Sequence, residues 1–119
     1  MNEQEKLSLI PKSENYTQYM LDIIIKLPRV EKFSIGTEYK QSMYQMIEFI
    51  LYFNKCKNSE LYYLNKIDCL LTLQRIYLRI MKNNRWINEE KFQISIDKIS
   101  ELGKIVGGLL KHYGKVDKK

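Results

Sequence analysis

Residues that break helices are scarce in this chain of 119 residues. Proline occurs only at Pro11 and Pro28, and the five glycines are all at or beyond residue 36. Because proline and glycine are the strongest local interruptions of regular structure, the long stretches without them predict an all-α fold. The hydrophobic content of 45% is enough for one core, and the length fits one domain.

Apolar residues recur at spacings of three and four residues along four segments of the chain. The helices expected from this periodicity span about residues 14–27, 33–56, 59–84 and 88–114. Ser59 and Asn88 are good N-cap residues, and each is followed by glutamate, which favours a helix N-terminus. Matched helix lengths and short turns predict an antiparallel up-down four-helix bundle.

The predicted domain organisation has three parts. A flexible N-terminal arm is expected at residues 1–13, the four-helix bundle at 14–114 and a basic C-terminal tail at 115–119. The arm is predicted because residues 1–13 are polar, with one short apolar patch that ends at Pro11, and chain ends of this kind are often poorly ordered.

Two features favour contact between copies of the chain. The third expected helix is apolar around more of its circumference than one bundle core requires, which favours self-association. Gly103, Gly107 and Gly108 lie inside the fourth expected helix, where each costs about 1 kcal/mol relative to alanine. Their spacing predicts close approach by another helix, and a locally weak helix end is the alternative.

Few residues could support catalysis. An enzyme site needs a nucleophile, a base and a stabilising group that converge, and the single histidine, His112, is expected to be exposed near the C-terminus. Cys56 and Cys69 have neither the density of a disulfide scaffold nor the CxxC spacing of a zinc site, and both are expected to be packing residues. The sequence therefore predicts no enzymatic activity, no metal and no cofactor.

The same reading gives an expected location. The longest apolar stretch, residues 43–53, contains Glu48 and is shorter than the roughly 20 residues of a membrane span. The first fifteen residues lack the apolar core of a secretory signal. We therefore expect a soluble cytoplasmic protein with no membrane partner.

Positive charge is concentrated in the second half of the chain. The net charge is +6, and residues 59–119 carry twelve basic against seven acidic side chains. Four cations occur between Cys69 and Ile87 with no acidic residue among them, and further lysines follow Leu102. The candidate contacts for a polyanion or a polymerase are Arg75, Arg79, Lys82, Arg85, Lys104 and Lys111.

These cations suggest nucleic acid as a partner. Arginine can bind phosphate through two parallel hydrogen bonds, and Tyr77 or Trp86 could stack on unpaired bases. Positions 75, 79 and 82 share one helical stripe. An ordinary solvated helix face is the alternative that the residues themselves leave open.

The segment Lys26-Leu27-Pro28-Arg29-Val30-Glu31-Lys32-Phe33-Ser34-Ile35-Gly36 resembles the signature between the first two helices of a family of small bacterial four-helix bundles. Its members are the rRNA intervening-sequence proteins and the accessory variability determinant proteins of diversity-generating retroelements. The pattern at residues 64–79 and the sequence LGKIVGGLLK at 102–111 are more similar to the accessory group. The resemblance covers about residues 15–113.

This resemblance implies a homo-oligomeric, pentameric barrel of four-helix bundles. Such a protein would be a non-enzymatic accessory factor that binds a reverse transcriptase and RNA or DNA to support mutagenic cDNA synthesis. Pro28 and Gly36 would shape the connection between the first two helices, and Gly103, Gly107 and Gly108 would allow tight packing of the last one. The alternative is a structural oligomeric bundle of the intervening-sequence type, acting through protein–protein contacts.

Overall fold

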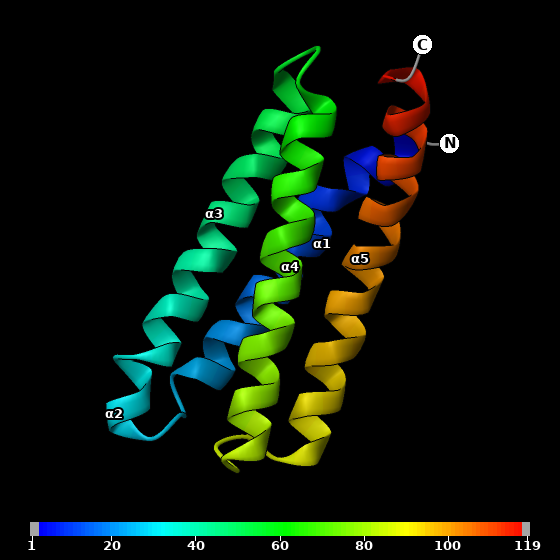
Figure 1. The fold of residues 1–119 in the computed structure, drawn as a ribbon. Helices are drawn as coiled ribbons and strands as arrows, with labels where there is room; N and C mark the ends of the chain where they lie inside the picture. Colours follow the sequence, from blue (N-terminus) through cyan, green and yellow to red (C-terminus); the bar gives the residue numbers. More distant parts are fainter. Residues whose placement is uncertain (1–2, 118–119) are drawn as a thin grey trace.

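The computed structural model describes residues 3–117, with side chains up to residue 115, and the described part of the chain is helical apart from short connections. The helices are α1 (Glu3–Ile24), α2 (Arg29–Lys32), α3 (Ile35–Lys55), α4 (Glu60–Asn83) and α5 (Glu89–Asp117). The four long helices run antiparallel to their neighbours in sequence, and α2 is a single turn in the first connection (Figure 1). The predicted all-α four-helix architecture is confirmed.

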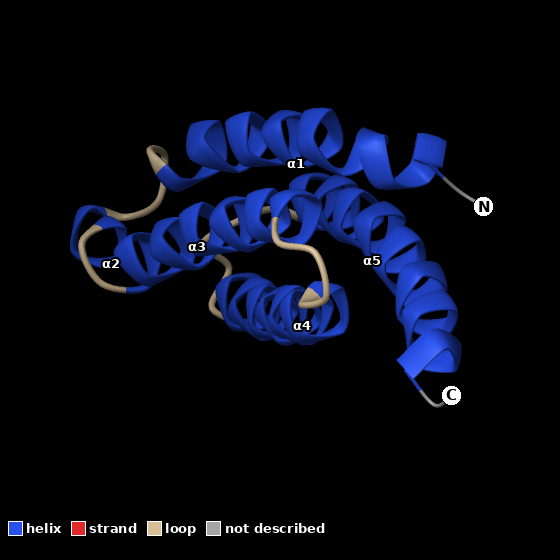
Figure 2. Ribbon diagram, turned by 90° about the horizontal axis from the view of Figure 1, so that it is seen from above, coloured by secondary structure: helices blue, strands red, loops and turns tan. Residues whose placement is uncertain are grey.

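The bundle places α1 and α4 on opposite sides. Seen along the bundle, α3 and α5 lie between them (Figure 2), and α1 and α4 each pack against both α3 and α5. The apolar stripes predicted from the periodicity face the centre, and their fully buried members include Tyr16, Met20, Tyr39, Met43, Met46, Leu64, Ile67, Leu71, Leu78, Ile99 and Val106. One core therefore holds the four helices together.

The helix boundaries follow the predicted capping signals closely. The Asn88 side-chain oxygen accepts a hydrogen bond from the Lys91 backbone N–H at 2.8 Å, so Asn88 caps α5 as expected. Helix α4 begins at Glu60, directly after Ser59, although the Ser59 hydroxyl makes no capping hydrogen bond. Helices α3 and α4 end within one residue of the positions predicted.

The predicted start of the first helix is wrong. Helix α1 begins at Glu3 instead of near residues 13–15, and Leu9 and Ser13 are fully buried in the bundle. Pro11 lies inside the helix. Proline has no backbone N–H, so the Leu7 carbonyl has no hydrogen-bond partner within the helix. Leu7 and Pro11 are both exposed, so water can donate a hydrogen bond to that carbonyl. Residues 3–13 are therefore part of the bundle and not a flexible arm.

The C-terminal end of the bundle also extends further than predicted. Helix α5 continues past Gly114 to Asp117, so the first part of the expected basic tail is helical. Lys118 and Lys119, the rest of that tail, lie outside the described residues, as do residues 1 and 2 at the other end.

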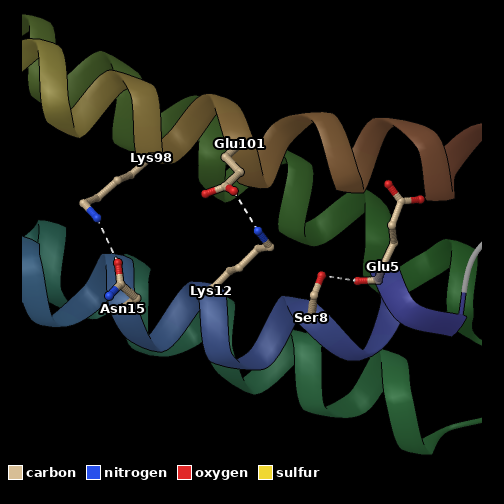
Figure 3. A network of polar contacts seen from close by, with 6 residues as sticks. All are labelled: Glu5, Ser8, Lys12, Asn15, Lys98 and Glu101. Carbon is tan, nitrogen blue, oxygen red and sulfur yellow. Dashed lines mark hydrogen bonds and ion pairs between the residues drawn. The ribbon is translucent and has the colours of Figure 1, made fainter.

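Polar contacts line the seam between α1 and α5 (Figure 3). The Lys12 ammonium lies 2.7 Å from the Glu101 carboxylate, and Lys98 donates a hydrogen bond of 2.8 Å to the Asn15 side chain. The hydrogen bond and charge of Lys12 lower the pKa of Glu101. Both partners of the ion pair are exposed, and such pairs contribute at most about 1 kcal/mol. These contacts therefore align the seam more than they strengthen it.

Three buried polar side chains join α1, α3 and α4 across the core. The Tyr16 hydroxyl donates a hydrogen bond of 2.8 Å to the Gln74 side-chain oxygen and accepts one from the Tyr39 hydroxyl. All three side chains are at most 1% exposed. Burial raises the pKa of both tyrosines, so both stay neutral and able to donate.

The packing of α1 predicts opposite effects for two substitutions in its first half. Leu9→Ala should lower the free energy of unfolding by about 2–5 kcal/mol, because it leaves a cavity in the core. Pro11→Ala should raise it by about 1–3 kcal/mol, because alanine restores a helical N–H at an exposed position. Urea denaturation measures both, and a flexible arm would leave both values at that of the wild type.

The buried hydrogen bonds predict a second pair of outcomes. Tyr16→Phe should lower the free energy of unfolding by about 1–3 kcal/mol, because the Gln74 oxygen and the Tyr39 hydroxyl each lose a partner inside the core. The triple variant Tyr16→Phe, Tyr39→Phe and Gln74→Met removes every member of the network and should recover most of that loss. Urea denaturation of both variants checks this, and a triple variant weaker than Tyr16→Phe would contradict it.

Candidate nucleic-acid interface

Helix α4 directs its predicted cations toward α5. The Arg75 guanidinium lies over Gly103, and the Lys82 ammonium reaches Glu89, both on α5. Arg79 lies between these two on the same stripe and is exposed. The three cations that the helical spacing placed on one stripe therefore lie on one face of α4, and this face borders the α4–α5 seam.

Arg75 is held more closely than an ordinary surface cation. It is half-buried, and a Cβ atom at Gly103 would lie 2.6 Å from one of its terminal nitrogens. The missing side chain of Gly103 thus makes room for the Arg75 guanidinium of α4. No backbone atom of another helix in the described residues lies within 4 Å of a Cβ built at Gly103. The charge of Arg75 also acts on the buried Tyr16 hydroxyl, where it partly opposes the rise in pKa caused by burial.

Gly107 and Gly108 differ from Gly103. Apart from the adjacent residues and the backbone of α5 itself, no described atom lies within 4 Å of a Cβ built at either position. The close helix approach predicted for these glycines is therefore not made by another helix of the described residues, and the surface of α5 at this point is open to another molecule.

Lys82 has a carboxylate partner that the sequence pattern did not reveal. Its ammonium lies 3.2 Å from the Glu89 carboxylate and 4.6 Å from the centre of the Phe92 ring. Glu89 follows the α4–α5 turn, so it falls outside the carboxylate-free stretch between Cys69 and Ile87. The row of cations is accordingly uncompensated at Arg79 but not at Lys82.

The other predicted cations are exposed. Arg85 lies in the α4–α5 turn with a positive φ of 62°, and Lys104 and Lys111 lie seven residues apart on one face of α5. The two carboxylates near Lys104 are engaged elsewhere: Glu101 pairs with Lys12, and Asp97 accepts a hydrogen bond from Gln93. In residues 3–117, Lys104 forms no ion pair.

The structure thus brings together part of the predicted set. Arg75 contacts Gly103, the residue before Lys104, and Arg79 is one turn from Arg75. Arg75 and Arg79 therefore lie beside the α4–α5 seam, whereas Lys104 is on the side of α5 that borders α1, where it lines a hollow with Ser8 and Lys12. Arg85 lies at one end of the seam, and Lys111 lies about 10 Å further along α5 from Lys104.

The aromatic residues expected to stack on bases are largely committed to the fold. Tyr77 is half-buried with its ring centre 6.0 Å from that of Tyr39, and Trp86 is half-buried against the core. Their free ring surface is therefore limited.

His112 is exposed, as predicted, and packs against the Tyr113 ring.

Other residues depart from the expectation or were not singled out. Cys69 is exposed, so it is not a packing residue, while Cys56 is half-buried. Val30 and Phe33 are 75% and 74% exposed in the first connection. Their signal in the sequence is a pair of large apolar side chains among the charged residues that follow Pro28.

The connection itself depends on two of the predicted structural residues. The Pro28 carbonyl accepts hydrogen bonds from the N–H groups of Glu31 and Lys32 at 2.8 and 3.0 Å. Gly36 is buried, and a Cβ there would lie 3.0 Å from the Ile24 side chain and 3.2 Å from the Glu31 carbonyl. A larger residue at position 36 would push the two helices apart.

Two general features of the described residues bear on the class of site. Residues 3–117 contain no group of three or more His, Cys, Asp or Glu side chains placed to hold a metal ion. Within the same range, no helix combines the length and the apolar character required to span a bilayer.

Comparison with known proteins gives one family. A family model described as bAvd-like matches residues 7–113 of the chain. A comparison with curated proteins found no match. The matched range begins in the second turn of α1 and reaches Tyr113 in α5, so it includes most or all of each long helix.

Proposed function

We propose, from the premise that the chain belongs to the bAvd-like family, that it is a non-enzymatic accessory protein of a diversity-generating retroelement. In this role it binds a reverse transcriptase and the RNA or DNA on which that enzyme acts, in the cytoplasm and without a cofactor. The observation that carries the nucleic-acid part is that the adjacent helices α4 and α5 each present an exposed cation, Arg79 and Lys104, that forms no ion pair within residues 3–117.

Contacts with phosphate would supply the binding energy. Each cation that neutralises a phosphate releases a bound counterion, and these contacts carry no sequence information. Arg79 and Lys104 are exposed and form no ion pair within residues 3–117, so they can reach a phosphate without breaking a contact. We therefore expect binding with little sequence preference and strong dependence on salt.

Assembly into a pentameric barrel completes the proposal. Gly107 and Gly108 face open space on α5, where no other helix of residues 3–117 comes close enough to offset their cost to the helix. Helix α4 also exposes large apolar side chains, namely Tyr62, Ile76 and Ile80. Contact with a neighbouring copy would offset the cost of the two glycines and would cover these three apolar side chains.

Charge reversal at the two unpaired cations tests the nucleic-acid contact. Arg79→Glu with Lys104→Glu should weaken binding to labelled single-stranded DNA and structured RNA about tenfold or more, because two phosphate contacts become repulsions. Fluorescence anisotropy at several salt concentrations measures both the affinity and the slope of log K against log salt. The slope should fall by about 1 for each contact removed.

A matched variant controls for net charge. Lys55→Glu with Lys57→Glu makes the same change in charge at the end of α3 and its turn, away from the seam, and should retain most of the affinity. Lys82→Gln should have a smaller effect than Arg79→Gln, because Glu89 already pairs with Lys82. If wild-type protein fails to bind even at low salt, a bundle acting only through protein–protein contacts becomes the better account.

Bulky side chains at the open glycines test assembly. Gly107→Leu and Gly108→Leu should keep α5 helical, because no described atom outside the adjacent part of α5 lies within 4 Å of the new Cβ. Each should weaken self-association about tenfold or more, as seen by light scattering across a range of protein concentrations. Gly114→Leu is the control, since Gly114 also lies in open space but near the end of α5. Unchanged assembly in all three variants would contradict the proposed contact.

A further inference from the structure

The connection between α1 and α3 exposes an unusual amount of apolar surface. Ile25, Val30 and Phe33 are 64%, 75% and 74% exposed, although each is a large hydrophobic side chain. The connection lies at the end of the bundle opposite both chain termini (Figure 1). Clustered exposed apolar side chains on a monomer indicate an interaction surface.

This connection holds its exposed side chains in fixed positions. Hydrogen bonds from Glu31 and Lys32 to the Pro28 carbonyl, and from the Ser34 N–H to the Glu31 carbonyl, close the turn. Leu27, 3% exposed, anchors it in the core. Val30 and Phe33 are three residues apart across the single turn of α2, so they project from the same side. A surface ordered before binding loses less entropy when a partner docks.

A hollow beside Phe33 could receive a side chain from a partner. It measures about 390 Å³ and is lined by Leu21, Ile24, Ile25, Lys32, Phe33, Thr37 and Lys40. Its floor and walls are mostly apolar, and its polar edge carries two ammonium groups and one hydroxyl. The Thr37 hydroxyl is already used, since it donates to the Lys32 carbonyl at 3.3 Å.

The charges around the hollow define the chemistry of the partner. The lining contains Lys32 and Lys40 and no carboxylate, and neither lysine forms an ion pair in the described part of the chain. The adjacent Glu31 carboxylate accepts a hydrogen bond of 3.1 Å from the Ser34 hydroxyl. An apolar hollow with two unpaired ammonium groups complements a bulky apolar side chain flanked by carboxylates.

We propose that this α1–α3 corner, formed by Ile25, Val30, Lys32, Phe33 and Lys40, is the docking surface for an acidic segment of the reverse transcriptase. One bulky apolar side chain of that segment enters the hollow, and its carboxylates pair with Lys32 and Lys40. This inference rests on the proposed function and adds to it the place and the chemistry of the protein–protein contact.

The test measures binding of this chain to the purified reverse transcriptase of the proposed retroelement, by isothermal titration calorimetry. Val30→Ser with Phe33→Ser should weaken binding about tenfold or more, because anchor residues carry most of the energy of an interface. Lys32→Glu with Lys40→Glu should weaken it similarly and reduce its dependence on salt. Tyr44→Ser is the matched control, because Tyr44 is 51% exposed on α3 but lies outside the corner.

Both double variants should keep the wild-type helicity, assembly and affinity for nucleic acid, because the altered side chains are exposed or lie at the edge of the hollow. Wild-type binding that survives in Val30→Ser with Phe33→Ser overturns the docking surface and leaves the proposed function in place. No binding by wild-type protein overturns the proposed partnership itself. A change in assembled mass in the double variants overturns the inference by showing that the corner contacts another copy of the chain.

Discussion

A chain of hydrogen bonds in the core fixes how three of the four long helices, α1, α3 and α4, fit together. Tyr16, Tyr39 and Gln74 come from α1, α3 and α4, and each must meet the others at one height along the bundle for the bonds to form. Apolar contacts alone tolerate sliding of one helix past another, whereas a buried donor left without a partner costs about 1–3 kcal/mol. The network therefore selects one register for these three helices, and Arg75, which follows Gln74 on α4, lies over Gly103 on α5.

The helical arrangement divides the surface of the protein into two different regions. Exposed cations lie along α4 and α5, where the proposed partner is a polyanion. Exposed apolar side chains with unpaired lysines gather at the corner between α1 and α3. The proposed accessory role requires two such regions, and in this bundle the two lie in separate parts of the surface.

Much of this fold follows from the sequence, because each long helix carries a regular apolar stripe and recognisable ends. The exception is the first half of α1, where Pro11 suggested a break although Leu9, Ser13, Tyr16 and Met20 continue the stripe. The proline is tolerated because it faces solvent. Which side of a helix faces solvent depends on how the helix packs against the others, so the local sequence did not reveal it. The same limit applies to Gln74, a polar residue whose burial makes sense only with two tyrosines from other helices.

The candidate site was only partly predictable for a related reason. Spacing along α4 placed Arg75, Arg79 and Lys82 on one face, because that depends on the helix alone. Whether each cation is free depends on α5, which supplies Glu89 to Lys82 and bare backbone to Arg75. The exposed corner around Phe33 depends in turn on the path of the connection, which no local pattern specifies.

The partners of α1 have a consequence for how the protein forms in the cell. One seam of this helix closes against α5, where Lys6 donates to Tyr113 at 3.4 Å and Lys12 meets Glu101. These contacts join α1 to α5, so they form only after α5 has left the ribosome. The hairpin of α3 and α4 is local and can form earlier. Until α5 is available, α1 keeps part of its apolar face uncovered, which leaves the nascent chain prone to wrong association during that interval.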